Sequence, residues 1–143
     1  LKGYYKKWLD AFINYTATKA TFETDVLLFS GQVKKGDELP LVPRHRVSLG
    51  VNVRPLDNLT LSLFGNYVSN QFLLGDEPNQ GKQLADYFVL NSRIAYEHKY
   101  WTAQLVFNNM TNSKYSSSGI ITNQPYFVPA PGFNMFAGVS FKY

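Results

Sequence analysis

The sequence predicts an all-β chain that forms part of a transmembrane, antiparallel, up-and-down β-barrel. Three observations support this fold class. Six segments alternate apolar and polar residues with a period of two, which is typical of strands with one apolar face. Long and short connections between these segments follow one another in strict alternation. The mean hydropathy is −0.22, and no stretch approaches the roughly 18 consecutive apolar residues of a membrane-spanning helix.

The six alternating segments have about the 9–11 residues that a tilted strand needs to cross a membrane. In chain order they are residues 8–18, 46–54, 59–68, 87–97, 101–108 and 133–143. The second is the clearest, with Val47, Leu49, Val51 and Val53 on one face and Arg46, Ser48, Gly50, Asn52 and Arg54 on the other. We expect the apolar face of each segment to contact lipid and the polar face to line the lumen.

The connections between the segments provide a second, independent signal. Two are short, at residues 54–58 and 97–100, and three are long, at about residues 19–43, 70–86 and 110–132. Outer-membrane barrels have short periplasmic turns and long extracellular loops, so the two kinds must alternate. Because barrels of this type normally end at the periplasmic face, we expect all three long connections to lie outside the cell.

The composition argues against several classes of function. The 143 residues contain no cysteine, which removes disulfides, thiolate metal sites and thiol catalysis. The net charge of +4 comes from scattered basic pairs, so we expect no nucleic-acid partner. The two histidines, His45 and His98, fall in different connections, and no Ser-His-Asp arrangement or glycine-rich phosphate loop is visible. We therefore predict no enzymatic activity, no catalytic residue, no metal site and no cofactor.

Four polar residues in or beside the long connections are candidates for ligand binding. Arg44 and His45 could meet an anionic ligand or a lipopolysaccharide phosphate, and the alternative is the polar start of a strand. Asp76 and Glu77 could bind a cation, but two adjacent carboxylates without further spaced oxygen ligands do not make a calcium loop. The alternative for this second pair is two solvated loop acids.

The last eight residues, 136–143, resemble the C-terminal signal that is read by the outer-membrane assembly machinery. That signal has a polar residue, a glycine two positions on, two apolar residues spaced by one, and an aromatic residue at the end. Gly138, Phe141 and Tyr143 match it, whereas Phe136 stands where the pattern has a polar residue. An unpaired edge strand can be captured by another sheet, so we expect these residues to act in assembly. The alternative is an ordinary last strand.

Three longer motifs resemble segments of TonB-dependent receptors. Residues 36–45 are similar to the family's GD-x-LP-x-VPRH segment, which leads into a strand. Residues 67–79 resemble the segment that leaves a strand for the next outer loop. Residues 106–115 resemble the V-x-N-L-x-N-x-x-Y stretch before the last loop. Each motif alone is weak, but their order, their spacing and their position before a terminal aromatic strand make the set specific.

The resemblance covers nearly the whole chain and implies about the final quarter of the family's barrel of about 22 strands. It implies that residues 1–143 are the C-terminal part of the barrel domain, without the family's plug domain and TonB box. The chain starts at Leu1 without a signal peptide, so we expect a mature protein or a fragment. The implied function is TonB-dependent uptake, across the bacterial outer membrane, of a scarce nutrient such as an iron–siderophore complex.

The resemblance also implies a set of partners. They are membrane lipid, lipopolysaccharide, the outer-membrane assembly machinery, a small-molecule nutrient, and TonB through the missing N-terminal part. The alternatives are a passive outer-membrane pore or another outer-membrane barrel, an outer-membrane enzyme, and a soluble all-β protein. An upstream plug would favour the receptor over the pore, an enzyme needs catalytic residues near the outer rim, and a soluble protein would leave cells without detergent.

Overall fold

The computed structural model describes residues 1–142, and these residues form strands, turns and loops. Seven strands make the principal sheet, in the order β1-β2-β5-β6-β9-β10-β13, and all neighbours are antiparallel. They are β1 (Lys2–Tyr5), β2 (Leu9–Ala17), β5 (His45–Leu56), β6 (Leu59–Val68), β9 (Tyr87–Glu97), β10 (Trp101–Asn108) and β13 (Asn134–Phe141). No helix among the described residues is long and apolar enough to cross a membrane. Tyr143 lies outside the described residues.

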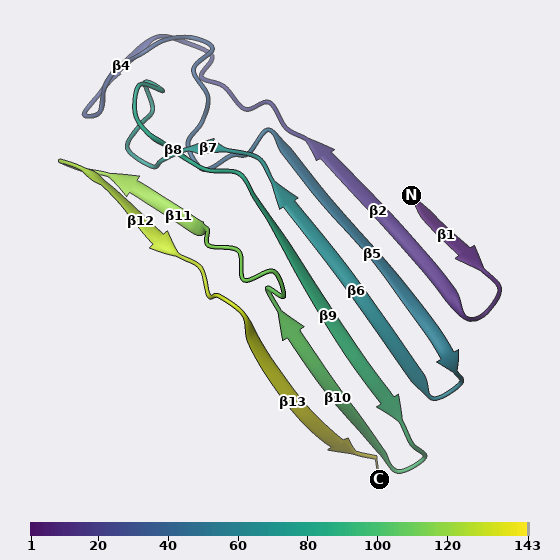
Figure 1. Cartoon of the computed structure of the whole chain (residues 1–143). Coiled ribbons are helices and arrows are strands. Elements are labelled where there is room, and N and C mark those ends of the chain that lie inside the picture. Colours follow the sequence, from purple (N-terminus) through teal and green to yellow (C-terminus); the bar gives the residue numbers. More distant parts are fainter. Residues whose placement is uncertain (143) are drawn as a thin grey trace.

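The chain runs up and down through this sheet without a crossover. Figure 1 shows the three short turns at one end of the sheet and the three long connections at the other. Each long connection contains a small two-stranded sheet. The paired strands are β3 (Val26–Leu28) with β4 (Gly31–Val33), β7 (Gln71–Phe72) with β8 (Gln83–Leu84), and β11 (Ser116–Ile121) with β12 (Pro125–Pro129). The all-β fold, the antiparallel order and the alternation of long and short connections are therefore confirmed.

The structure adds elements that the period-two pattern did not reveal. The six predicted segments are β2, β5, β6, β9, β10 and β13, and β1 is a seventh strand that pairs with β2 from Tyr5↔Leu9 to Lys2↔Phe12. With four residues, Lys-Gly-Tyr-Tyr, β1 is too short to show an alternation. We also predicted no strands within the long connections, where the strands of the hairpins have only two to six residues.

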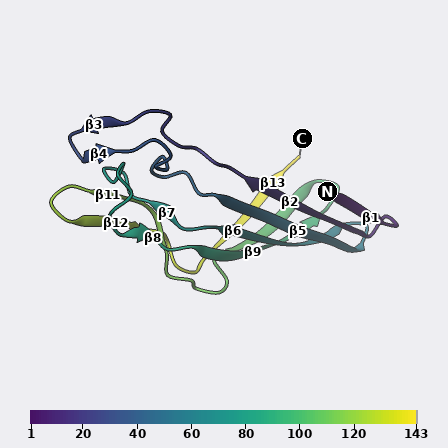
Figure 2. The same cartoon turned by 90° about the horizontal axis from the view of Figure 1, so that it is seen from above.

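The register carries the alternation of each strand across the whole sheet. Val51 lies opposite Ala11 and Leu63, whereas Asn52 lies opposite Asp10 and Ser62. Successive side chains point to opposite faces of a strand, so apolar residues of neighbouring strands share one face and polar residues share the other. Figure 2 shows that the sheet is curved. The predicted grouping of residues 46–54 into two faces is confirmed by this register.

The buried core of the chain lies mainly in the long connections and not in the sheet. Val33, Leu73 and Leu84 are its fully buried large side chains, and all three lie outside the principal strands. On the apolar face of the sheet, by contrast, Leu49 and Leu63 are 41% and 39% exposed. The described chain thus leaves a broad apolar surface uncovered, as expected where lipid and not protein covers it.

The three long connections form one interlocked layer. The Leu41 N–H donates to the Phe72 carbonyl at 2.9 Å, which ties the first connection to the second. The Ile121 N–H donates to the Leu74 carbonyl at 2.7 Å, and Leu74 and Ile120 form a parallel bridge between the second and third connections. These backbone contacts hold the hairpins together above the end of the sheet.

Candidate functional site

The apolar face has an aliphatic centre with aromatic residues towards both ends of the strands. The aliphatic residues include Ile13, Leu49, Leu63, Ile94 and Leu105. Aromatic residues at the end with the long connections are Tyr15, Tyr67 and Phe88, and those at the other end are Tyr5, Tyr96 and Trp101. An apolar band between two aromatic girdles is typical of transmembrane β-barrels, because aromatic rings favour the two membrane–water boundaries.

The spacing of the two girdles fits the thickness of a membrane. Phe88 and Tyr96 lie eight positions apart on β9, which is about 27 Å along a strand that rises about 3.4 Å per residue. A strand tilted by about 40° would then span about 21 Å of depth, close to the band of about 25 Å in outer-membrane barrels. The apolar face therefore has the dimensions of a lipid-facing surface.

The polar face is joined from strand to strand by side-chain hydrogen bonds. The Asn52 amide on β5 donates to the Asp10 carboxylate on β2 at 2.7 Å, and the Ser62 hydroxyl on β6 donates to the Asn52 oxygen at 2.6 Å. Further along the sheet, Arg93 donates to Gln104 at 3.1 Å. Such a network satisfies polar groups that would otherwise be costly on a partly enclosed surface.

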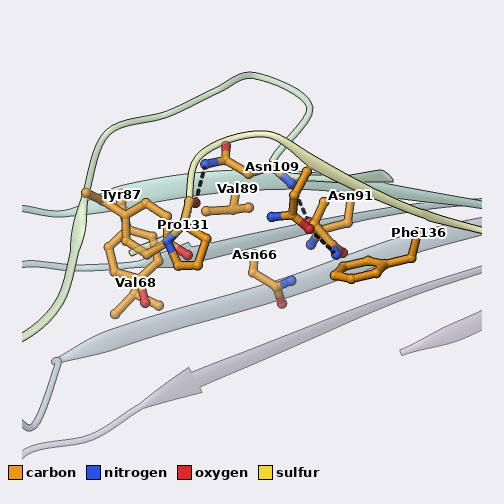
Figure 3. Close-up of a pocket in the computed structure, with 11 residues that line it drawn as sticks. Asn66, Val68, Tyr87, Val89, Asn91, Asn109, Pro131 and Phe136 are labelled. Carbon is orange, nitrogen blue, oxygen red and sulfur yellow. Dashed lines mark hydrogen bonds between the residues drawn. The ribbon is translucent and has the colours of Figure 1, made fainter. Parts of the chain in front are cut away.

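A hollow of about 660 Å³ lies on the polar face, where the sheet meets the third long connection. Figure 3 shows the side chains around it, which come from β6, β9, β10, β13 and the connection itself. The lining residues are Asn66, Val68, Tyr87, Val89, Asn91, Asn108, Asn109, Tyr115, Pro131, Asn134 and Phe136. None carries a formal charge at neutral pH, so this wall offers amide groups, phenol groups and apolar surface to a ligand.

Asn109 fixes the third connection at the rim of this hollow. Its side-chain amide donates to the carbonyls of Ser113 at 2.9 Å and Pro131 at 3.1 Å, and its oxygen accepts the Ser113 N–H at 2.9 Å. Its backbone N–H donates to the Asn91 side chain at 2.9 Å. Asn109 has a φ of +48°, in the left-handed region that asparagine tolerates better than most residues.

A stacked pair of tyrosines completes the hollow. The rings of Tyr87 and Tyr115 lie 4.2 Å apart between centroids, at an angle of 25°. The hollow was not among the predicted sites, although Asn109 and Tyr115 both lie in the motif of residues 106–115. The signal available in the sequence was an Asn-Asn pair at the point where a strand gives way to a long connection.

The structure places Arg44 and His45 at the start of β5, but in different surroundings. Arg44 forms an ion pair with Glu38 while its side chain remains 62% exposed. The hydrogen bond and the charge of Glu38 raise the pKa of the Arg44 guanidinium. The His45 Nδ1 lies 2.9 Å from the Tyr15 hydroxyl, and the two rings stack 6.0 Å apart. Arg44 thus remains accessible to an anion, whereas the His45 ring contacts a residue of the apolar face.

Asp76 and Glu77 organise the connection between β7 and β8. The buried Asp76 carboxylate accepts the N–H groups of Gln80 and Gly81, both at 2.9 Å. The alternative of a solvated acid pair is therefore wrong for Asp76. Burial acts to raise the pKa of Glu77, but hydrogen bonds, including one from the Gly75 N–H, leave that pKa below its ordinary value.

The four candidate ligand-binding residues are not gathered into one site. Asp76 serves its own loop, and Arg44 pairs with Glu38, which in turn contacts Asn79 through hydrogen bonds in both directions. Among residues 1–142, no group of three or more carboxylate or histidine side chains could hold a metal ion. At the same end of the sheet, the amide-lined hollow offers a ligand a continuous uncharged surface, which these four separate residues do not.

Two of the three predicted assembly residues lie on β13, the final strand of the sheet. Gly138 lies opposite Gln104, and Phe141 lies opposite Trp101 on the apolar face. The Phe141 side chain is 70% exposed. The third, Tyr143, belongs to the part of the chain that the structure does not describe.

A curved antiparallel sheet with two aromatic girdles, a hydrogen-bonded polar face and long connections at one end defines a transmembrane β-barrel wall. Residues 1–110 match the family model described as TonB dependent receptor-like, beta-barrel, and the chain belongs to this family. Members of the family are receptors and transporters of the outer membrane of Gram-negative bacteria, and the family is not one of enzymes. No curated protein matches the sequence.

Solved structures of receptors share this fold. The siderophore receptor PiuA from Acinetobacter baumannii is 19% identical with a TM-score of 0.78, over 99% of this chain and 20% of PiuA. The ferric yersiniabactin uptake receptor FyuA from Yersinia pestis is 17% identical with a TM-score of 0.75, over 96% of this chain and 21% of FyuA. The closed form of the ferric-catecholate import receptor Fiu from E. coli is 19% identical with a TM-score of 0.72, over 94% and 18%. The chain thus spans about a fifth of these relatives.

Proposed function

We propose that this chain forms part of the barrel wall and outer loops of a TonB-dependent outer-membrane receptor, which takes up a scarce nutrient such as an iron–siderophore complex. The observation that carries the proposal is the match of residues 1–110 to the receptor barrel family. The girdled apolar face supports placement in a membrane, and the interlocked connections support a preformed outer surface. The similar receptors are named for siderophores or ferric complexes, which supports that class of ligand.

The proposed partners follow from the two faces and the two ends of the sheet. The apolar face contacts membrane lipid, and the exposed Arg44 at the end with the long connections meets a ligand anion or a lipopolysaccharide phosphate. Gly138 and Phe141 on the final strand act in recognition by the outer-membrane assembly machinery, as the sequence motif predicts. TonB acts through a part of the receptor that precedes this chain. His45, Asp76 and Glu77 support the ligand surface from within their loops.

The proposal is tested by iron uptake in cells that express the full-length receptor and lack their other iron receptors. We expect saturable uptake of at least one iron-55-labelled siderophore complex, and loss of that uptake when TonB is deleted. Uptake that rises in proportion to concentration and ignores TonB would instead indicate the alternative, a passive outer-membrane pore. Catecholate, hydroxamate and citrate complexes supply a panel of ligand charge and size.

A matched pair of variants tests the part played by the hollow. The Ser48 hydroxyl donates to the Asn66 oxygen at 2.9 Å, so Ser48→Ala and Asn66→Ala break the same hydrogen bond. Of these two residues, Asn66 lines the hollow and Ser48 does not. We expect Asn66→Ala to raise the KM for uptake more than Ser48→Ala does, at equal receptor abundance. Equal effects of the two variants on KM would show that the hollow is not on the ligand path. They would not contradict the proposal that the protein is a receptor.

A further inference from the structure

Two of the three short turns carry the same arrangement of lysine and aromatic side chains. In the β1–β2 turn, the rings of Tyr5 and Trp8 pack edge to face at 5.8 Å, and the Lys6 ammonium lies 5.6 Å from the Tyr5 centroid. In the β9–β10 turn, the Lys99 ammonium lies 5.2 Å from the Tyr100 centroid. Both turns lie at the end of the sheet away from the long connections (Figure 1).

The Lys6 and Lys99 ammonium groups lie at the short-turn end of the apolar band. On β9 and β10, Tyr96 and Trp101 belong to the aromatic girdle of the apolar face, with ring centroids 5.5 Å apart. The His98 ring continues this cluster into the turn, 5.4 Å from Trp101. Aromatic girdles lie at the level of lipid headgroups, so an ammonium beside the girdle lies at the level of the phosphates. Lys6 and Lys99 therefore occupy the depth at which a headgroup would meet them.

Within the part of the chain that the structure describes, the lysines of these turns form no ion pair with a carboxylate. The ion pairs of that part are Arg44–Glu38, Arg54–Asp10 and Lys142–Glu97. None of them includes Lys6, Lys7 or Lys99, and these side chains are exposed. The third short turn has Leu56 and Asp57 in place of lysine and aromatic residues, so it provides an internal contrast.

We propose that the two lysine–aromatic turns bind the headgroups of anionic phospholipids, of the phosphatidylglycerol class, in the leaflet that faces the short turns. The inference rests on the proposed function, which places the apolar face in a bilayer. The lysine ammonium groups pair with the phosphodiester, while the exposed rings of Tyr5, Trp8 and Tyr100 pack against the glycerol and upper acyl chain. A zwitterionic headgroup carries its own ammonium, which competes with the lysines, so an anionic lipid is preferred.

The test uses the full-length receptor in phosphatidylcholine vesicles that contain phosphatidylglycerol, with bromine on the acyl chains of one lipid or of the other. Brominated chains quench nearby tryptophan, and the signal of Trp8 and Trp101 is isolated by subtracting the Trp8→Phe/Trp101→Phe receptor. We expect brominated phosphatidylglycerol to quench more than its share of the lipid predicts. The triple variant Lys6→Gln/Lys7→Gln/Lys99→Gln should lower that enrichment by roughly fivefold for each lysine that meets a lipid.

Two control variants separate charge at this rim from charge elsewhere. Lys34→Gln/Lys35→Gln changes the same residue type at the other end of the sheet and should leave the enrichment unchanged, and lysine-to-arginine changes at the rim should retain it. Equal quenching by both brominated lipids would overturn the headgroup preference while the membrane placement stands. Quenching by neither lipid would show that the face is not in a bilayer and would overturn the proposed function as well.

Discussion

Replacement of Asn109 by alanine should release the third long connection from the sheet. The Asn109 side chain is 3% exposed and makes three hydrogen bonds of 2.9–3.1 Å to the backbone of Ser113 and Pro131. Each is worth about 1 kcal/mol. An alanine at a φ of +48° costs about a further 1 kcal/mol, because its Cβ crowds the backbone there. We expect local opening of the connection to become easier by about 3–4 kcal/mol.

The assay is amide hydrogen exchange across residues 110–133 in the full-length receptor, where local opening governs the rate. A change of about 3–4 kcal/mol corresponds to a loss of protection of between about 100-fold and 1000-fold. Asn112→Ala is the matched control, because Asn112 also has a positive φ, of +49°, but makes one exposed bond, to the Phe133 N–H. Equal losses of protection in the two variants would refute the assignment of Asn109 as the anchor.

Three further changes test the membrane face, the packing of the polar face and the loop electrostatics. Val51→Arg, on the apolar face near mid-strand, should cost about 2–4 kcal/mol, whereas Asn14→Arg, on the polar face opposite the uncharged Ser48, should be nearly neutral; urea unfolding in lipid compares them. Gly50→Val should clash with the rings of Phe12 and Phe64, because a Cβ at position 50 would lie 2.5 Å from the first and 2.8 Å from the second. It should lower the yield of heat-modifiable barrel in outer membranes, and Phe12→Ala/Phe64→Ala should restore part of that yield. The pKa of Glu77 is lowered on folding, so its contribution is present above the unfolded value of 4.5 and disappears as the pH falls through the folded value. Loop protection should therefore decline below about pH 4.5, and Glu77→Gln should abolish that pH dependence.

The sheet could be predicted from sequence because its faces differ in polarity along every long strand. Val51 and Asn52 are neighbours in the chain, so their opposite environments appear directly as an alternation. The short strand β1 carries no such contrast, and pairing with β2 specifies it instead. The lengths of the connections were also visible, since a run without alternation is a local property.

The hollow and the loop layer could not be predicted, because both depend on contacts between distant residues. The register brings Asn108 opposite Asn134, and the third connection then folds back so that Tyr115 stacks on Tyr87. Asp76 is visible in the sequence as an acid, but the wrapping of its own loop around the carboxylate is not. Such wrapping follows from backbone geometry, and a single sequence does not display it.

The interlocked long connections limit how this surface can be re-engineered. A foreign loop grafted in place of one connection alone would lose the Leu41–Phe72 or Leu74–Ile121 hydrogen bonds that its neighbours require. Grafts should therefore carry all three connections together. The tip of the β3–β4 hairpin is different, because Phe29 is fully exposed there. A displayed peptide or epitope tag inserted at this tip would project into solvent without separating the layer beneath it.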